Sequence, residues 1–313
     1  MLEVEFPGIN LSVFLATMVV AAMPVLLAAI GELVVEKSGV LNLGVEGLMI
    51  IGAVCGFIVS VETGSSIVGI FGALLAGASL AGIFGLLTQY FHASQVATGL
   101  ALTLFGLGLS ALLGQSYTGI RPPDFPVPDF GFLSELPVIG ILFFSYDILV
   151  YFSILLVIVI WWFLKYSRTG LALRAIGENH NAAHSLGYHV TRVRLAAILF
   201  GGACGGLGGA YLALIRVPQW TEGMTAGAGW IALALVVFGS WRPFRVVFGA
   251  FLFGGITLLQ LNLQALGIAI NPAYLSMTPY IVTIVALVVI SRMGNQTSIR
   301  APACLGKPFD APK

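Results

Sequence analysis

Charged residues are scarce in this sequence. Among its 313 residues, 14 are Lys or Arg and 13 are Asp or Glu, so charged residues make up 9% of the chain, against about 25% in soluble proteins. The formal net charge is only +1, which provides no basic surface for a nucleic acid. Because 58% of the residues are hydrophobic, the composition predicts an integral membrane protein.

Cysteines are also few. The chain has 3 of them, and the positions of Cys55, Cys204 and Cys304 match neither a metal-ligand spacing nor a disulfide framework. His180 and His184 are four residues apart, but a metal site needs further ligands and partners that orient them. We therefore predict no metal site, and the two histidines are interpreted as polar residues of a docking surface.

Nucleotide-binding and catalytic motifs are missing. No GxxxxGK[ST] occurs, because the Gly306–Lys307 pair is followed by Pro308 and lacks the upstream glycine. No GxSxG or HExxH is present, and the glycines at 201–209 do not follow a strand as a dinucleotide fold requires. The sequence predicts a protein that is not an enzyme and binds no cofactor of its own.

Long apolar runs dominate the chain instead. A helix needs about 20 apolar residues to cross a bilayer. The N-terminus lacks the positive region of a signal peptide, so the first apolar segment is expected to be retained. The runs at 228–240 and 279–291 are short and are expected to be half-helices or tilted neighbours of the next segment. We predict an all-α, polytopic transmembrane helical bundle with about 8–10 spans, from candidates at 9–30, 39–60, 66–90, 95–115, 146–164, 194–215, 228–240, 246–270 and 279–291.

Lys and Arg concentrate in the cytoplasmic loops of membrane proteins. With nine spans and the N-terminus outside, only Arg121 and Arg216 lie outside, whereas the other twelve cations lie inside. The C-terminus is then cytoplasmic. This organisation gives one transmembrane domain over 1–300, a proline-rich extracytoplasmic loop over 116–145, a cytoplasmic loop over 165–194 and a cytoplasmic tail over 301–313.

The cytoplasmic loop has a helical pattern of its own. We predict a short helix over 170–176, a turn at Gly177, and a second short helix that Asn179 caps and that stops at Gly187. This helix pair is either a structured connector or a docking surface for a soluble partner.

Glycine is abundant, with 39 residues. Small residues that recur every four positions allow membrane helices to pack closely. Two such stripes are predicted to make tight helix contacts, one formed by Gly201, Gly205 and Gly209, with Gly202 and Gly206 beside it, and one by Ala73, Gly77, Ala81 and Gly85.

Polar residues inside the apolar runs are candidates for a translocation pathway. Asn42 and Glu46 are four apart and are expected to share a helix face. A charge at the bilayer centre costs about 3 kcal/mol on insertion scales and marks a functional site by default. Glu46 either lines a pathway or gate, or caps a neighbouring broken helix. Gln95, Thr98 and Asn262 are further candidates. No Arg or Lys is expected inside the bundle to meet an anion, which favours a neutral polar solute.

Several motifs resemble one family. The segment "GELVVEKSGVLNLGVEGLMIIGA" (31–53) is similar to the signature of permease subunits of bacterial ABC importers, in the nucleoside and simple-sugar branch related to ribose and branched-chain amino acid permeases. The similarity continues at "ATGLALTLFGLGLSAL", "GLALRAIGENHNAAHSLGYHVTRVR", "GWIALALVVFGSWRP" and "PACLGKPFD", and so extends over nearly the whole chain.

The resemblance implies a multi-pass permease of the bacterial inner membrane that imports a nucleoside or simple sugar by alternating access. It implies three partners: a cytoplasmic ABC ATPase that binds the ATP, a second and longer permease forming a heterodimer, and an extracytoplasmic solute-binding protein. The ATPase is expected to dock on the loop that contains Gly170, Arg174, Gly177, Glu178, Asn179 and Gly187. The alternatives are a branched-chain amino acid ABC permease and an ion-coupled secondary transporter that uses Glu46.

Overall fold

A computed structural model describes residues 5–6, 9–134, 136, 138–265 and 301–310, and scattered positions between 274 and 289. Apart from a two-residue antiparallel pair, Glu5–Phe6 (β1) with Ile9–Asn10 (β2), the elements of this part are helical. The helices are α1 (Leu11–Lys37), α2 (Val45–Thr63), α3 (Ser66–Gln89), α4 (Gln95–Gly114), η1 (Gln115–Tyr117), η2 (Gly131–Leu133), α5 (Ile139–Phe143), α6 (Ile148–Tyr166), α7 (Arg168–Glu178), α8 (His180–Ser185), α9 (Val190–Tyr211), the π-helical η3 (Leu212–Arg216), α10 (Ala228–Phe238) and α11 (Pro243–Ala265).

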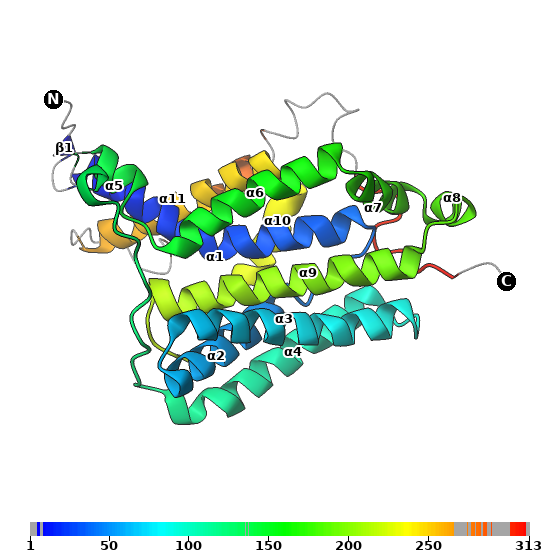
Figure 1. Ribbon diagram of the computed structural model, residues 1–313, viewed down its shortest axis with the longest axis horizontal. Coiled ribbons are helices and arrows are strands. Elements are labelled where there is room, and N and C mark those ends of the chain that lie inside the picture. The colour runs from blue at the N-terminus through cyan, green and yellow to red at the C-terminus, as the bar shows by residue number, and fades with distance from the viewer. Residues whose placement is uncertain are drawn as a thin grey trace.

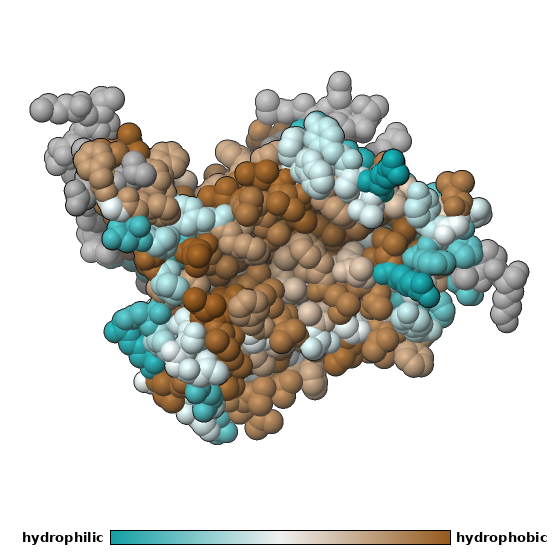
Figure 2. Space-filling model, in the orientation of Figure 1, coloured by the Kyte–Doolittle hydropathy of each residue, from teal (hydrophilic) through white to brown (hydrophobic). Residues whose placement is uncertain are grey.

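The long helices run side by side along the longest axis of the molecule (Figure 1). At one end lie α7, α8 and the tail segment 301–310, here called the α7–α8 end; at the other lie α5 and the loop before it. In Figure 2 hydrophobic residues cover the middle of the visible face, and hydrophilic residues gather towards the two ends. Within the described residues, seven helices are long and apolar enough to cross a membrane, as expected for a polytopic bundle.

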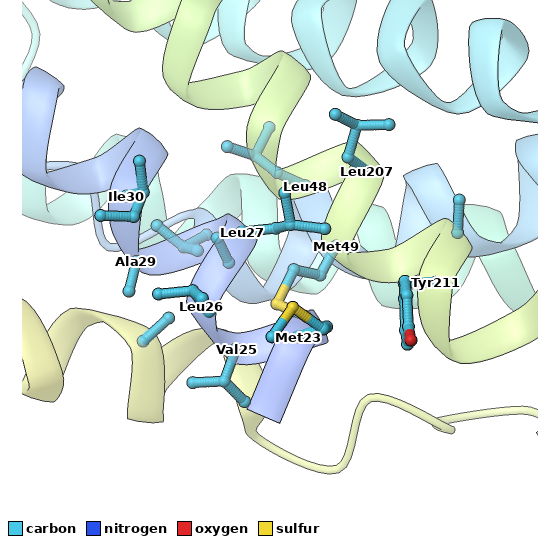
Figure 3. Close-up of a cluster of buried hydrophobic side chains, with 14 of the residues drawn as sticks. Met23, Val25, Leu26, Leu27, Ala29, Ile30, Leu48, Met49, Leu207 and Tyr211 are labelled. Atoms are coloured by element: carbon cyan, nitrogen blue, oxygen red, sulfur yellow. The ribbon is translucent and has the colours of Figure 1, made fainter. Parts of the chain in front are cut away.

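The core of the bundle is built from α1, α2 and α9. Figure 3 shows Met23, Leu27 and Ile30 of α1 beside Met49 of α2 and Tyr211 of α9, and each of these side chains is at most 1% exposed. The outer helices α3, α4 and α6 instead leave large apolar side chains exposed, such as Leu75 and Leu104. This contrast suits a bundle whose surface meets lipid.

Helices α2, α3 and α9 approach one another at the predicted small-residue stripes. A Cβ atom on Gly77 would overlap the carbonyl oxygen of Gly202, and a Cβ atom on Gly206 would overlap that of Ala73. A Cβ atom on Gly52 of α2 would likewise overlap the backbone of Gly206. The predicted tight packing is therefore confirmed for these stripes, because no side chain larger than hydrogen fits between the backbones.

Two span boundaries differ from the prediction. Helix α1 continues past residue 30 to Lys37, with both Glu32 and Glu36 buried in its last turns. The next segment, 38–44, is not helical, and α2 starts only at Val45. The expectation that Asn42 and Glu46 share a helix face is therefore wrong, because Asn42 precedes the helix.

The short run at 228–240 forms α10, which has 11 residues and is about 16 Å long at 1.5 Å per residue. This length is about half of what a bilayer requires, so the half-helix expectation is confirmed. The predicted span at 279–291 lies largely outside the described residues.

The predicted helix pair is present as α7 and α8. Asn179 caps α8 through a bond from the backbone N–H of Ala182 to its Oδ1 (3.0 Å), and Gly187 follows with φ +89°. The turn between the helices lies at Asn179, whereas Gly177 still belongs to the last turn of α7. A Cβ atom on Gly177 would overlap the carbonyl oxygen of Lys37, so this glycine permits close packing rather than a turn.

Candidate translocation and coupling sites

The Glu46 carboxylate caps the half-helix α10. Its Oε1 accepts hydrogen bonds from the Thr225 hydroxyl (2.6 Å) and the Gly227 backbone N–H (2.9 Å), and its Oε2 accepts one from the Gly229 N–H (2.7 Å). Glu46 is 3% exposed. The first N–H groups of a helix have no partner within it, and the N-terminus carries partial positive charge. A carboxylate placed there satisfies both requirements.

This geometry matches one of the two interpretations of Glu46, a carboxylate that caps a broken helix. The approach of α2 to α10 is equally close along the backbone: a Cβ atom on Gly229 would overlap the backbone nitrogen of Glu46. Whether the Glu46 region also borders a pathway stays a prediction.

The segment 38–44 connects Glu46 to helices α1 and α4. The Asn42 N–H donates to Glu32 Oε1 (3.3 Å), and Asn42 Oδ1 accepts from the Gly44 N–H (2.9 Å). The Leu41 N–H donates to the side-chain oxygen of Gln95 at the start of α4 (2.8 Å). Three predicted pathway residues, Asn42, Glu46 and Gln95, are thus brought to one irregular segment and its borders.

Gln95 is 5% exposed, and its side-chain Nε2 has no hydrogen-bond partner within the described part of the chain. Thr98 lies one turn further along α4 and is partly exposed. Asn262 lies near the end of α11, where its side chain donates to the Leu258 carbonyl of the same helix (3.0 Å). No hydrogen bond among the described residues joins the side chain of Thr98 or Asn262 to Glu46, and their role in a pathway remains a prediction.

Two buried carboxylates of α1 were not among the candidates. Glu32 and Glu36 are each 1% exposed; Glu32 accepts the Asn42 N–H described above, and Glu36 accepts a hydrogen bond from the indole N–H of Trp241, in the loop between α10 and α11. The residues Ser240 and Trp241 have φ of +51° and +54°, a conformation uncommon for non-glycine residues. The sequence signal for these two residues is their position at the end of an apolar run. Burial of Glu36 could not be predicted from it, because its partner Trp241 is 205 positions away in the sequence.

A second cluster holds the α7–α8 end together around Arg194. Its guanidinium donates to the carbonyl oxygens of Ser38 and Lys307 (both 3.2 Å) and to Nδ1 of His180 (3.1 Å). An arginine has no acceptor, so Nδ1 accepts. The side chain is 0% exposed. A buried arginine is therefore present, but its guanidinium is occupied by the protein's own groups, so it does not contradict the expectation that no Arg or Lys inside the bundle meets an anion.

The tail segment 301–310 completes this cluster. The Cys304 N–H donates to the Gly177 carbonyl (2.9 Å), and the Gly306 N–H donates to the Gly39 carbonyl (3.2 Å). The rings of His180 and His184 both pack edge-on against Phe309, with centroids 5.2 and 5.4 Å away. Figure 1 shows the tail passing beside α7 and α8. The two histidines are thus part of a packed junction.

The cluster has electrostatic consequences for His180. Burial is the largest cause that lowers the pKa of its imidazole, and the positive charges of Arg194 and Lys307 lower it further. The neutral imidazole that accepts from Arg194 is therefore the favoured form. Gly39 is part of the same junction: it has φ +88°, and a Cβ atom on it would lie 2.9 Å from Arg194 Nη2.

The described residues thus form an apolar helical bundle with one half-helix, a buried polar segment at 38–44 and a helix pair at one end. Residues 14–289 match the family described as the branched-chain amino acid transport system / permease component. The chain belongs to this family, so it is a multi-pass permease subunit of an ABC transporter, and the expectation that it is not an enzyme is confirmed.

Three relatives have names that refer to a class of solute. The chain is 40% identical over 257 residues to a putative glucose ABC transporter permease protein, TsgC13, of Haloferax volcanii, covering 80% of this chain and 78% of the relative. It is 33% identical to the guanosine ABC transporter permease protein NupQ of Bacillus subtilis, covering 88% and 91%. It is also 33% identical to the nucleoside ABC transporter permease protein NupC of Lactococcus lactis, covering 89% and 92%. The resemblance to the nucleoside and sugar branch is confirmed.

Proposed function

We propose that this chain conducts a neutral polar solute, a nucleoside or a simple sugar, into the cell by alternating access. Support comes from the relatives, which are named for glucose, guanosine and nucleosides. At the border of segment 38–44, the side-chain Nε2 of Gln95 has no partner within the described part of the chain and offers an uncharged hydrogen-bond donor to such a solute. The buried guanidinium of Arg194 has protein partners already, so it is not available to a substrate carboxylate.

We place the α7–α8 end in the cytoplasm, as the distribution of Lys and Arg indicates. There a separate ABC ATPase docks on the surface of α7 and α8, and a second permease and an extracytoplasmic binding protein complete the transporter. Glu178 and Asn179 are exposed at the junction of the two helices, where a docking partner reaches them.

The observation that carries this proposal is a connection from α8 to α10 that consists of hydrogen bonds at its two ends and the short backbone segment 38–44 between them. His180 of α8 bonds to Arg194, and Arg194 bonds to the Ser38 carbonyl. Ser38 begins the irregular segment that ends at α2, where Glu46 holds α10. A displacement of α7–α8 by ATPase closure is therefore transmitted to the one half-helix of the described core, without a long flexible connector.

An ion-coupled secondary transporter finds no support in the Glu46 geometry. Its carboxylate already accepts three hydrogen bonds, two of them from backbone N–H groups of a helix N-terminus. A proton or ion that bound there would have to break the cap in each cycle. The second alternative, a branched-chain amino acid permease, is distinguished by the solute uptake test.

The solute class is tested by uptake in cells that express the chain with its ATPase, second permease and binding protein. Labelled guanosine, uridine, glucose and leucine are compared, each at the same concentration. We expect uptake of a nucleoside or of glucose that depends on an intact ATPase. Uptake of leucine alone would overturn the proposal in favour of the branched-chain amino acid alternative.

Docking is tested with Glu178→Lys, which reverses a charge at the α7–α8 junction. We expect loss of ATPase co-purification and of uptake, with unchanged amounts of the chain in the membrane. Glu222→Lys is the matched control, because Glu222 is equally exposed but lies in the 217–227 segment, outside α7 and α8. Normal uptake and normal ATPase recovery with Glu178→Lys would remove the docking surface from α7–α8.

A further inference from the structure

The half-helix α10 is held at both of its ends by a buried carboxylate. At its start, Glu46 of α2 accepts the hydrogen bonds of the capping residues described above. Just after its end, the indole N–H of Trp241 donates to the carboxylate of Glu36 in α1. Glu46 is 3% exposed and Glu36 is 1% exposed. Because segment 38–44 joins α1 to α2, the position of α10 depends on how these two helices lie relative to each other.

The turn that carries Trp241 has an unfavourable backbone. Ser240 and Trp241 have φ of +51° and +54°, in the left-handed region that is costly for residues with a side chain. The turn is also short, because the backbone N–H of Arg242 bonds to the Gly239 carbonyl (3.0 Å) and α11 begins at Pro243. Strained backbone persists only where the surrounding structure holds it, and it is common in segments that switch between two states.

Helix α7 packs directly beside Glu36. A Cβ atom on Gly177, in the last turn of α7, would overlap the carbonyl oxygen of Lys37, the residue that follows Glu36 in α1. Lys37 and Glu178 also line a common pocket of about 280 Å³. Closely packed elements transmit displacement, because they leave no free volume to absorb it. A movement of α7 therefore shifts the last turn of α1, and with it the Glu36 carboxylate.

The indole of Trp241 borders an open space. It lines a pocket of about 660 Å³, together with Trp161 and Leu164 of α6 and Phe244 of α11. In the structure the Trp241 side chain is packed into the protein instead, since the residue is only 6% exposed. A pocket of this size accommodates an indole ring. The ring therefore has a second position available once its bond to Glu36 is broken.

We propose that the Glu36–Trp241 hydrogen bond is a latch on the cytoplasmic end of α10, and that α7 operates it. With the bond intact, the strained turn is held in place. Closure of the ATPase moves α7 against Lys37, which draws Glu36 away from the indole. The turn then relaxes, Trp241 enters the pocket beside α6, and the end of α10 is released. Glu46 still holds the start of the half-helix, so α10 pivots about that point.

The latch rests on the proposed function, because it assigns a route by which an ATPase acts on the permease. It is distinct from the connection through His180, Arg194 and segment 38–44, which leads to the start of α10. The two routes reach opposite ends of the same half-helix, and each ends at a buried carboxylate. The identity of the solute does not enter the argument.

The latch is tested first in the unaltered transporter. The complex of this chain with its second permease and ATPase is produced with fluorotryptophan. The fluorine resonance of Trp241 is identified by its loss in Trp241→Phe and by its displacement in Glu36→Gln. We expect this resonance to shift when ATP and vanadate trap the closed ATPase, because the indole exchanges a carboxylate for an open pocket. Trp162 is the control, since it is 55% exposed on α6 and does not line the pocket.

A second measurement is ATP hydrolysis by the reconstituted complex without solute. A hydrogen bond to a charged group shifts an equilibrium by about tenfold or more, so Trp241→Phe should raise this rate about tenfold. In Glu36→Gln the amide oxygen still accepts from the indole, but the neutral bond is about half as strong, and the rate should rise about threefold. Tyr117→Phe is the matched control and should leave the rate unchanged, because the Tyr117 hydroxyl donates to the Glu62 carboxylate (2.6 Å) near the far end of α2.

A bond with only a structural role would change hydrolysis in the opposite direction. Its loss would lower the rate together with the recovered amount of the complex, and that result would overturn the latch. A Trp241 resonance that stays in place on ATP trapping, while uptake is normal, would overturn the latch and leave the proposed function intact. Absence of ATP-driven uptake by the unaltered complex would overturn both. If Trp241→Phe does not assemble, the resonance assigned through Glu36→Gln decides.

Discussion

Glu46 allows a sharp quantitative test, because one carboxylate serves three donors of a single helix start. In Glu46→Gln the amide oxygen still accepts hydrogen bonds in place of one carboxylate oxygen. The NH₂ group replaces the other oxygen, so it faces a backbone N–H donor and cannot accept from it. A buried donor left unpaired costs about 1–3 kcal/mol, and loss of a charge at a partly buried helix N-terminus costs up to ~2 kcal/mol. We expect Glu46→Gln to lower the free energy of unfolding by about 3 kcal/mol in total.

The assay is the midpoint of heat denaturation of the detergent-solubilised chain, followed by size-exclusion chromatography, in parallel with solute uptake. A loss of this size corresponds to a shift of about 5 °C, because the entropy of unfolding is about 2.1 cal/mol/K per residue. Glu222→Gln removes an exposed carboxylate and serves as the control, with an expected shift within about 1 °C.

A second substitution identifies the cause of the shift. Thr225→Val removes one of the three donors to Glu46 and should destabilise by about 1–2 kcal/mol. If the two side chains act on each other, the double variant should lose less than the sum of the single losses. Unchanged stability of Glu46→Gln would refute the capping argument. Lost uptake at full stability would instead assign Glu46 to the pathway.

Two further predictions concern packing and pH. Gly206→Val should prevent folded expression, because the valine side chain would overlap the backbones of Ala73 and Gly77. Gly108→Ala should stabilise the chain by up to ~1 kcal/mol, because no atom lies within 4 Å of the new methyl group. Both variants are measured by the monodisperse fraction of the protein after extraction from the membrane. His180 has a pKa below its ordinary value, so its contribution to stability is present above about pH 6.5 and is lost as the pH falls through the lower, folded-state pKa. The protection factors of the 301–310 amides, which are corrected for the intrinsic pH dependence of exchange, should therefore fall between pH 7.5 and 5.5. The fall should be smaller in His180→Asn; an equal fall in both would contradict this assignment.

Local patterns predicted most of the membrane helices and their packing. Apolar runs located the seven long helices, and the four-residue spacing of small residues predicted close packing on α3 and α9, although it did not indicate that these two helices meet. These features depend on residues a few positions apart, which the sequence displays directly. The caps at Asn179 and Gly187 were predictable for the same reason.

Features that depend on partners elsewhere in the chain were harder to predict from the sequence. The first span was expected to end at residue 30, yet the helix continues to Lys37, since Asn42 and Trp241 satisfy the carboxylates of Glu32 and Glu36. The Trp241 partner lies 205 positions from Glu36. Arg194 was counted among loop cations, because nothing adjacent to it indicates that the tail covers it. Buried charges become plausible only when their partners are known.

The cap on α10 also has a consequence for how the chain is made. Glu46 and its donors lie between 179 and 183 positions apart, so at about 5–20 residues per second the ribosome needs roughly 10–40 s to deliver Thr225 after Glu46 has emerged. During that interval α2 is in the membrane, and the Glu46 carboxylate in its first turn has no hydrogen-bond donors from the α10 region. A chain that stops or misfolds before α10 keeps this defect. An incomplete subunit therefore differs from a finished one by a Glu46 carboxylate that lacks its three donors.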